Sequence, residues 1–380
     1  MEPILDSEIN TNDFNNTTFV LKNTNVSIAN ALRRTLLSDI PLVVFKTAQP
    51  DINSPKLIHF IANTTRLNNE LLKQRLNCIP IHMSPEEYPI DRLLLEVNIE
   101  NNTDSTLICT TEHFKIKDVN TGEYFPKSKM EEIFPPFISN SGQKYYVDFV
   151  RLRPKIADGI PGEKLQFTCK FSIGTSHDDT CFNAVGTCSY ECVVDAEAKQ
   201  EALVKKVQEW KNAGISVADI TMKEKDWKLL DGKRVIKPDC FKYTITTACL
   251  HSNPMLVIIA CNVLNNRLTK MAVALDADEV PIAPANNTMD NCYDITLINE
   301  DYTLGKVLEF MFYTKYFEQM KILTYCGFKK MHPHDDFSTI RLAYKDAIDK
   351  ASIKINFKSC IEDSIKAFNK IKSMFVDKNA

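Results

Sequence analysis

Four side chains between residues 177 and 192 are the strongest candidates for chemistry in this sequence. His177, Cys181, Cys188 and Cys192 offer an imidazole and three thiols, the donor types that hold zinc in a tetrahedron. No Cys-x-x-Cys pair occurs, however, and the last two cysteines fall in a stretch that alternates like a strand. Buried, unreactive thiols are the favoured interpretation. We therefore expect no metal and no other cofactor, and a zinc site at these residues is the alternative.

Two further pairs of residues suggest catalysis or metal binding. His332 and His334 could share a metal, but they flank a proline and no other ligands lie near them, which favours a turn. Cys249 and His251 could act as nucleophile and base, but they fall in an expected loop, and no orienting carboxylate is identifiable. The acidic pairs are typical of solvated loops and are Asp178-Asp179 and Asp335-Asp336. With no coherent catalytic constellation, we predict that the chain is not itself catalytic.

The charge balance argues against direct binding of nucleic acid. The 380 residues carry a formal net charge of −3, and Lys and Arg form only short runs such as Lys329-Lys330. A protein that grips DNA phosphates is expected to be basic or to carry a basic stripe. We expect contact with nucleic acid only through partners, since direct contact would need a basic surface that folding assembles.

The N-terminal segment and the longest apolar run predict neither secretion nor membrane insertion. Residues 1–10 are acidic and polar, unlike a signal peptide. The apolar run of residues 255–261 is far shorter than the roughly 20 residues that span a bilayer. The 12 cysteines are scattered, so we expect reduced thiols in an intracellular protein with no membrane contact.

The first clear element is an amphipathic helix that ends before Pro41. Its apolar positions recur at helical spacing and are Ile28, Ala31, Leu32, Thr35 and Leu36. Asn25 or Ser27 can cap its first turn, because a short polar side chain accepts the free N–H groups there. The opposite face carries Asn30, Arg33 and Arg34.

The segments after this helix predict a β-rich region between helical parts. A helix is expected at residues 68–76, and strands are expected at residues 92–100, 145–152 and 165–173. Residues 195–213 form the next helix, with Leu203, Val207 and Trp210 on one face and Gly214 as its stop. The later elements are a strand at residues 241–249 and a helix at residues 255–271 that opens with Pro254.

The last part of the chain repeats this plan in a smaller form. Thr303 can cap a helix. The apolar face of that helix is Leu304, Val307, Leu308, Met311 and Phe312, and the flanking elements are strands at residues 294–298 and 338–344 and a helix at residues 361–375. Helices this short need a partner surface, so the two copies are expected to pack on each other about a pseudo-two-fold axis.

These patterns predict four parts. A first domain comprises residues 1–81 and 195–274, and a β-rich insert of residues 82–194 interrupts it. Residues 275–290 lack periodicity and form a linker to a second domain of residues 291–380.

Five segments resemble assembly subunits of RNA polymerase, and they are residues 25–41, 75–81, 227–241, 299–305 and 327–334. The first resembles the α-motif of the bacterial α subunit and of the eukaryotic third subunit, and the next two resemble stretches that flank the insert of the third subunit. The last two resemble the eleventh subunit, although Tyr302 stands where a histidine normally precedes the threonine. The third subunit and its relatives often carry a cysteine-rich metal loop, but residues 82–95 contain no cysteine.

The resemblance implies an α/β (α+β) fold with two RNA polymerase α-type dimerisation units that form an intramolecular pseudo-dimer, the first interrupted by a mostly β insert. It also implies a non-catalytic platform that joins the two largest polymerase subunits, with two small zinc-binding subunits as further partners and no homo-oligomer. By this resemblance, Asn30, Arg33 and Arg34 contact the large subunits, as suits the planar fork of arginine. The seam of the pseudo-dimer would consist of Leu32, Leu36, Leu304, Leu308 and Phe312.

Fusion of two such units makes their meeting intramolecular. A tether of about 15 residues gives an effective concentration on the order of millimolar, so assembly no longer depends on two balanced gene products. The resemblance implies a viral source, because such fusions are associated with large DNA viruses. For a viral protein of this kind we expect a site of action in the host cytoplasm and packaging in the virion. The competing hypothesis is an enzyme or independent binding module that only shares the fold, and the paired motifs favour the polymerase subunit.

Overall fold

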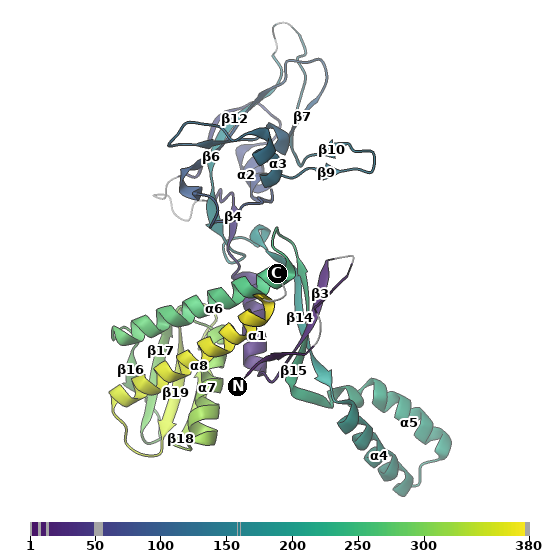
Figure 1. Ribbon diagram of the computed structural model, residues 1–380, viewed down its shortest axis with the longest axis vertical. Helices are drawn as coiled ribbons and strands as arrows, with labels where there is room; N and C mark the ends of the chain where they lie inside the picture. Colours follow the sequence, from purple (N-terminus) through teal and green to yellow (C-terminus); the bar gives the residue numbers. More distant parts are fainter. Residues whose placement is uncertain are drawn as a thin grey trace. The chain divides into compact units, whose positions relative to one another are not determined.

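The structure, a computed structural model, describes residues 2–6, 9–12, 15–48, 56–157, 159 and 161–376. These residues form a mixed α/β protein with eight α-helices and antiparallel sheets (Figure 1). The chain divides into two compact units. Residues 1–37, 186–247 and 252–380 form unit 1, and residues 38–185 and 248–251 form unit 2.

These boundaries differ from the ones expected at residues 82 and 194, because residues 42–81 fold with the β-rich region. Strand β5 (Ile58–Asn63) pairs with β12 (Lys164–Lys170), and β4 (Leu42–Val44) pairs with β13 (Ser172–Gly174). These pairings join residues that lie about a hundred positions apart, so local periodicity carries no sign of them.

Unit 1 contains two sheets, each with helices that follow its strands. The first sheet has the order β1-β3-β15-β14, with β2 paired to β3. Its elements are β1 (Ile4–Leu5), β2 (Asn10–Thr11), β3 (Asn16–Lys22), α1 (Val26–Ser38), β14 (Val185–Val194), β15 (Ile236–Thr247) and α6 (Asn253–Asp276). Helix α1 follows β3, and α6 begins after Ser252, whose hydroxyl accepts the Met255 N–H.

The second sheet of unit 1 has the order β16-β17-β19-β18. Its elements are β16 (Ile282–Pro284), β17 (Cys292–Ile298), α7 (Tyr302–Phe312), a π-helical segment (Tyr313–Gln319), β18 (Leu323–Lys329), β19 (Phe337–Tyr344) and α8 (Lys350–Val376). The expected linker is therefore partly structured, since α6 runs to Asp276 and β16 adds an edge strand to β17.

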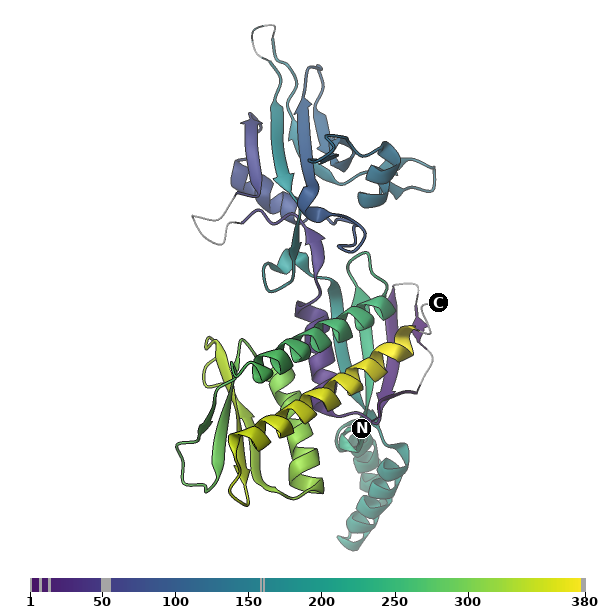
Figure 2. The ribbon, with the colours of Figure 1, turned by 60° about the vertical axis from the view of Figure 1, so that its left-hand side comes forward.

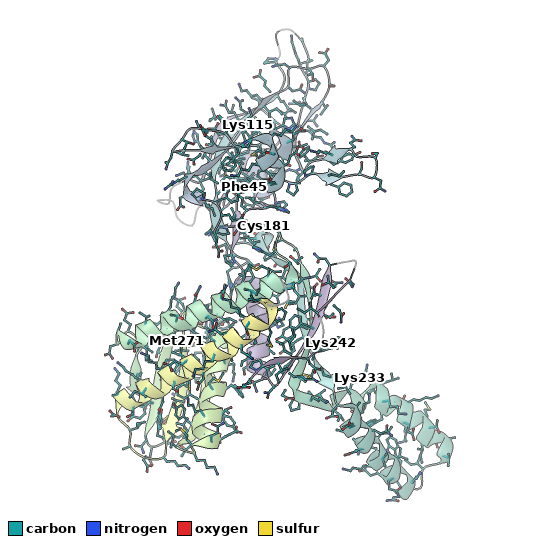
Figure 3. The ribbon with its side chains drawn as sticks, in the orientation of Figure 1. Phe45, Lys115, Cys181, Lys233, Lys242 and Met271 are labelled. Atoms are coloured by element: carbon teal, nitrogen blue, oxygen red, sulfur yellow. The ribbon has the colours of Figure 1, made fainter. Side chains whose placement is uncertain are left out.

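Helices α6 and α8 pack side by side along unit 1, as Figures 1 and 2 both show. Both helices bury long apolar stripes, and Met271 on α6 is marked in Figure 3. At the C-terminal end of α8, Phe375 meets Phe19 of β3 edge to face at 5.0 Å between ring centroids. The first sheet and the last helix of the chain thus share one hydrophobic core.

A helical hairpin joins β14 to β15 within unit 1 (Figure 1). Helix α4 (Ala196–Asn212) confirms the helix predicted there, and Gly214 follows it with a φ of +75°, the left-handed conformation expected of a stop. Helix α5 (Val217–Leu229) was not predicted. The hairpin buries little beyond Leu203, Ile220 and Trp227, and Lys233 marks its foot in Figure 3.

Unit 2 is built on the sheet β5-β12-β6-β8 and three two-stranded ribbons. Its remaining elements are α2 (Asn69–Asn77), β6 (Leu93–Glu100), β7 (Leu107–Thr110), β8 (Lys115–Asp118), α3 (Lys127–Ile133), β9 (Phe137–Ile138), β10 (Lys144–Tyr145) and β11 (Asp148–Leu152). Aromatic rings fill its core, among them Phe45, which is labelled in Figure 3 and lies 4.9 Å from Phe171 between centroids. No helix in the described residues is long and apolar enough to cross a membrane.

Candidate protein-interaction site

Helix α1 presents its polar edge at a surface of unit 1. The helix buries Ile28, Ala29, Ala31, Leu32, Thr35 and Leu36, which confirms the predicted apolar face. Asn25 begins the helix, because its Oδ1 accepts the Ser27 N–H at 2.8 Å. The residues expected to contact partners, Asn30, Arg33 and Arg34, are each half-buried on the other side.

Arg33 is held by its own helix and not by a carboxylate. Its Nε and Nη2 donate to Oδ1 of Asn30 at 3.1 and 2.9 Å, and no described acidic side chain pairs with it. Burial raises the pKa of the nearby Cys188 thiol to about 12, and the charge of Arg33 opposes that rise. Arg33 therefore offers a positive charge that is oriented but not neutralised.

Arg34 has a different environment, because it reaches the second half of the chain. Its Nη2 donates to Oδ2 of Asp301 at 2.5 Å, and its Nε donates to Oγ1 of Thr303 at 2.8 Å. Burial opposes ionisation of Asp301, but the hydrogen bonds from Thr303 and the charge of Arg34 leave its pKa below the ordinary value. The side chain of Arg34 is still 39% exposed.

A groove of about 550 Å³ runs between α1 and α7 within unit 1. Its lining includes Val26, Asn30, Tyr190, Lys306, Phe310 and Tyr313. Val26 is 49% exposed and Tyr313 is 40% exposed, so apolar surface lies open beside the polar edge of α1. The Lys306 ammonium pairs with Glu309 at 2.5 Å along the rim. Exposed apolar side chains ringed by fixed polar groups are typical of a surface that binds protein.

The five predicted seam residues are all fully buried in unit 1, and they are Leu32, Leu36, Leu304, Leu308 and Phe312. Phe312 stacks on Phe357 of α8 at 5.8 Å between centroids. The polar contacts between the early and late parts of unit 1 include Arg34 with Asp301, Arg267 with Glu300 at 2.6 Å, Asn265 with Asn369 at 2.9 Å and Lys358 with Asp276 at 2.7 Å.

The candidate zinc ligands are not gathered into a cluster. His177 and Cys181 belong to unit 2, whereas Cys188 and Cys192 lie on β14 in unit 1. His177 bonds Asp39 through Nε2 at 2.7 Å. Burial, together with a hydrogen bond to Asp179, raises the pKa of the Cys181 thiol to about 12, which disfavours the thiolate that a metal needs. The described residues contain no group of three or more His, Cys, Asp or Glu that could hold a metal.

The remaining candidate pairs have local structural partners. His334 N–H donates to Nδ1 of His332 at 3.2 Å, which confirms the predicted turn. Cys249 and His251 lie in the loop after β15, which ends at Thr247, two residues before the predicted end of that strand. Three of the four acidic side chains have structural partners: Asp178 binds Lys46 and the Thr175 N–H, Asp179 caps a short 3₁₀ turn, and Asp335 accepts the His332 N–H.

The prediction that Thr303 caps the late helix was wrong. Asp301 is the N-cap of α7, and its Oδ1 accepts the Thr303 N–H at 2.8 Å. Aspartate caps a helix at least as well as threonine, so Asp301, two positions before Thr303, was the better N-cap candidate in the sequence. Tyr190 in the groove was also missed, because its strand β14 begins at Val185, far along the chain from the end of α1 at Ser38.

The family of the RNA polymerase Rpb3/Rpb11 dimerisation domain matches residues 18–309 of the chain. The match begins in β3 and ends within α7, so it takes in α1, unit 2 and α6. A comparison of the chain with curated proteins found no match.

Proposed function

Because the chain belongs to the family of the RNA polymerase Rpb3/Rpb11 dimerisation domain, we propose that it is the platform on which the two largest subunits of a DNA-directed RNA polymerase assemble. Family membership makes it an assembly subunit of RNA polymerase in general, and other polymerase subunits are its expected partners. The proposed contribution of the chain is architectural and not catalytic.

The repeated plan of unit 1 supports the idea that two dimerisation units are fused. In each sheet a helix follows an inner strand, α1 after β3 and α7 after β17. A longer helix then follows a later inner strand, α6 after β15 and α8 after β19. The two longer helices pack together, as expected if each copy covers the other about a pseudo-two-fold axis. Unit 2 would then be the insert of the first copy.

A fused pair would assemble without a second chain. Few residues separate the end of α6 at Asp276 from the start of β17 at Cys292, so the second copy stays close to the first. A tether of this kind gives an effective concentration of about millimolar. This economy suits a polymerase that a large DNA virus brings into the host cytoplasm and packages in its virion, and we propose that origin on the resemblance alone.

The groove between α1 and α7 is the observation that carries the platform proposal. A partner chain seated there would cover Val26 and Tyr313 and meet Asn30, whose side chain accepts hydrogen bonds from Arg33. The guanidinium of Arg33 is already oriented by Asn30, so binding costs little side-chain entropy. Arg34 is the weaker candidate for the same contact, because Asp301 and Thr303 already bind it. Two small zinc-binding subunits complete the proposed partner set.

Affinity purification from the native source tests this proposal. A tagged chain is expected to recover two very large polymerase subunits in equal amounts, identified by mass spectrometry. Arg33→Glu places a negative charge at the proposed contact and is expected to reduce that recovery at least about tenfold. The acidic or carbonyl group of the partner would then be buried without the positive charge of Arg33. Arg34→Glu is less informative, because it also breaks the internal bond to Asp301.

Lys205→Glu is the matched control, because it makes the same charge change at an exposed position of α4. Recovery of the large subunits should survive it. The chain emerging alone or as a homodimer would contradict the platform role and favour a protein that only shares the fold. If Arg33→Glu and Lys205→Glu reduced recovery of the large subunits equally, the groove would not be part of the interface.

A further inference from the structure

A hollow of about 540 Å³ in unit 2 gathers four arginines from separate parts of the chain: Arg66, Arg75, Arg151 and Arg153. All four side chains are exposed to solvent. Arg66 follows β5, Arg75 lies on α2, and the other two belong to β11 and the residue after it. The fold of unit 2 thus assembles a basic surface that no run of the sequence contains.

Two of the arginines are fixed in place. The Arg75 Nε donates to the carbonyl oxygen of Phe149 at 2.6 Å, and its Nη2 donates to that of Asp148 at 3.0 Å. Carbonyl oxygens orient this guanidinium without neutralising it. The Arg153 Nε donates to Oε1 of the buried Glu163 at 2.5 Å, so its charge is largely compensated.

The side chains of the other two arginines have no partner among the described residues. The guanidinium groups of Arg66 and Arg151 form no hydrogen bond and no ion pair there. Asp148 is the one carboxylate among the lining residues, and its backbone carbonyl binds Arg75. Three cationic groups without a carboxylate partner therefore surround a hollow whose lining also includes the apolar side chains of Leu67 and Leu152.

We propose that this hollow binds an acidic peptide segment of a protein partner, with carboxylates seated on Arg66, Arg75 and Arg151. Planar guanidinium groups form paired hydrogen bonds with carboxylates, and Leu67 offers contact for the carbon chain of the peptide. A nucleic acid fits less well, because it needs a charged track and stacking faces, and no aromatic side chain lines the hollow in an exposed position. The inference does not depend on the platform role, since this hollow shares no residue with the groove of unit 1.

Fluorescence anisotropy with the full chain tests the proposal. The probe is a labelled peptide of Glu and Leu residues, and the same peptide with Gln in place of Glu is its control. We expect the acidic peptide to show saturable binding and the Gln control peptide to show none. Arg66→Glu combined with Arg151→Glu should weaken it at least about tenfold, since both groups lose their attraction and repel the ligand.

Lys205→Glu combined with Lys211→Glu makes the same charge change on exposed positions of α4 and should leave binding unchanged. Arg66→Lys combined with Arg151→Lys keeps the charge and removes the planar fork, so intermediate binding is expected. Absence of saturable binding, or equal effects of the two Glu pairs, would overturn the proposal. A labelled dT20 strand that binds more tightly, and depends on the same arginines, would overturn it in favour of nucleic acid.

Discussion

Arg34 of α1 and Asp301, the N-cap of α7, meet at 2.5 Å between Nη2 and Oδ2, although 267 positions separate them in the chain. The same guanidinium bonds the hydroxyl of Thr303, and the same carboxylate accepts the Thr303 N–H. One contact thus fixes the start of α7 and attaches it to α1. It also joins two of the segments whose sequences resemble different polymerase subunits.

Asp301→Ala should destabilise unit 1 by about 1–2 kcal/mol, because α7 loses its cap and Arg34 loses its anion. Arg34→Ala should cost less, since the cap survives. The two changes should not be additive in urea unfolding, because they remove one shared interaction. If the losses of unfolding free energy in Asp301→Ala and Arg34→Ala were additive in the double variant, the two side chains would have no coupling energy.

Stability should fall on acidification partly through Asp301, whose pKa is lowered in the folded chain. A lowered folded pKa gives a stabilisation that is present above the unfolded pKa of about 4 and is lost as the pH falls through the lower, folded value. Asp301→Asn retains a capping oxygen but removes the charge. Its free energy of unfolding should therefore depend less steeply on pH below about pH 4 than that of the unmodified chain.

Asp226→Asn is the control for this pH series. Asp226 is exposed on α5, and its carboxylate forms no ion pair in the part of the chain that the structure describes. Its pH profile should follow that of the unmodified chain. Identical profiles for all three proteins would mean that Asp301 has no share in acid unfolding.

Tyr243→Phe should destabilise unit 1 by about 1 kcal/mol. The buried Tyr243 hydroxyl donates to the carbonyl oxygen of Ala29 in α1 at 2.7 Å, so β15 is bonded to α1. Phenylalanine keeps the stacking on Phe19, with centroids 5.0 Å apart, and removes only the hydrogen bond. Tyr145→Phe, at an exposed position of β10, should change stability by less than about 0.5 kcal/mol. Equal urea midpoints for the two variants would refute this role.

The sequence predicted the elements whose pattern is local. Helix α1 has a continuous apolar stripe, so periodicity located it. Helix α5 buries only Ile220 and Trp227, seven positions apart, and so lacks such a stripe. The sequence nevertheless contained an N-cap signal for α5, a serine followed three positions later by an acidic residue. In the structure the Ser216 hydroxyl accepts the Asp219 N–H and donates to the Asp219 carboxylate. Strand β16 has three residues and takes its structure from pairing with β17, which periodicity cannot show.

The two candidate binding sites also differ in how local their sequence pattern is. Asn30 and Arg33 lie three positions apart on one helix, so spacing alone placed them together. The arginine hollow draws on residues 66 to 153. Arg75 lay in a predicted helix and Arg151 in a predicted strand, but nothing in the sequence connected the two. Tertiary pairing of β7 with β11 and the docking of α2 bring these residues together. No pattern of hydrophobicity or charge encodes that meeting.

Gly305 should not tolerate a side chain. It lies in α7 directly beneath the ring of Phe328 from β18, and a Cβ at this position would overlap that ring. Tyr302 holds the ring from the side, edge to face, at 5.2 Å between centroids. Alanine would favour the helix by about 1 kcal/mol, but the overlap should cost about 1–3 kcal/mol and outweigh it.

Hydrogen exchange of the peptides that cover α7 and β18 is the appropriate measurement for Gly305→Ala, because it reports this part of unit 1 separately. Faster exchange is expected in both elements and not in unit 2. Phe328→Leu in the same chain should restore part of the protection, since leucine lacks the ring that the new methyl group meets. Unchanged exchange in Gly305→Ala would show that Phe328 moves aside at little cost. Failure of Phe328→Leu to restore protection would place the conflict elsewhere.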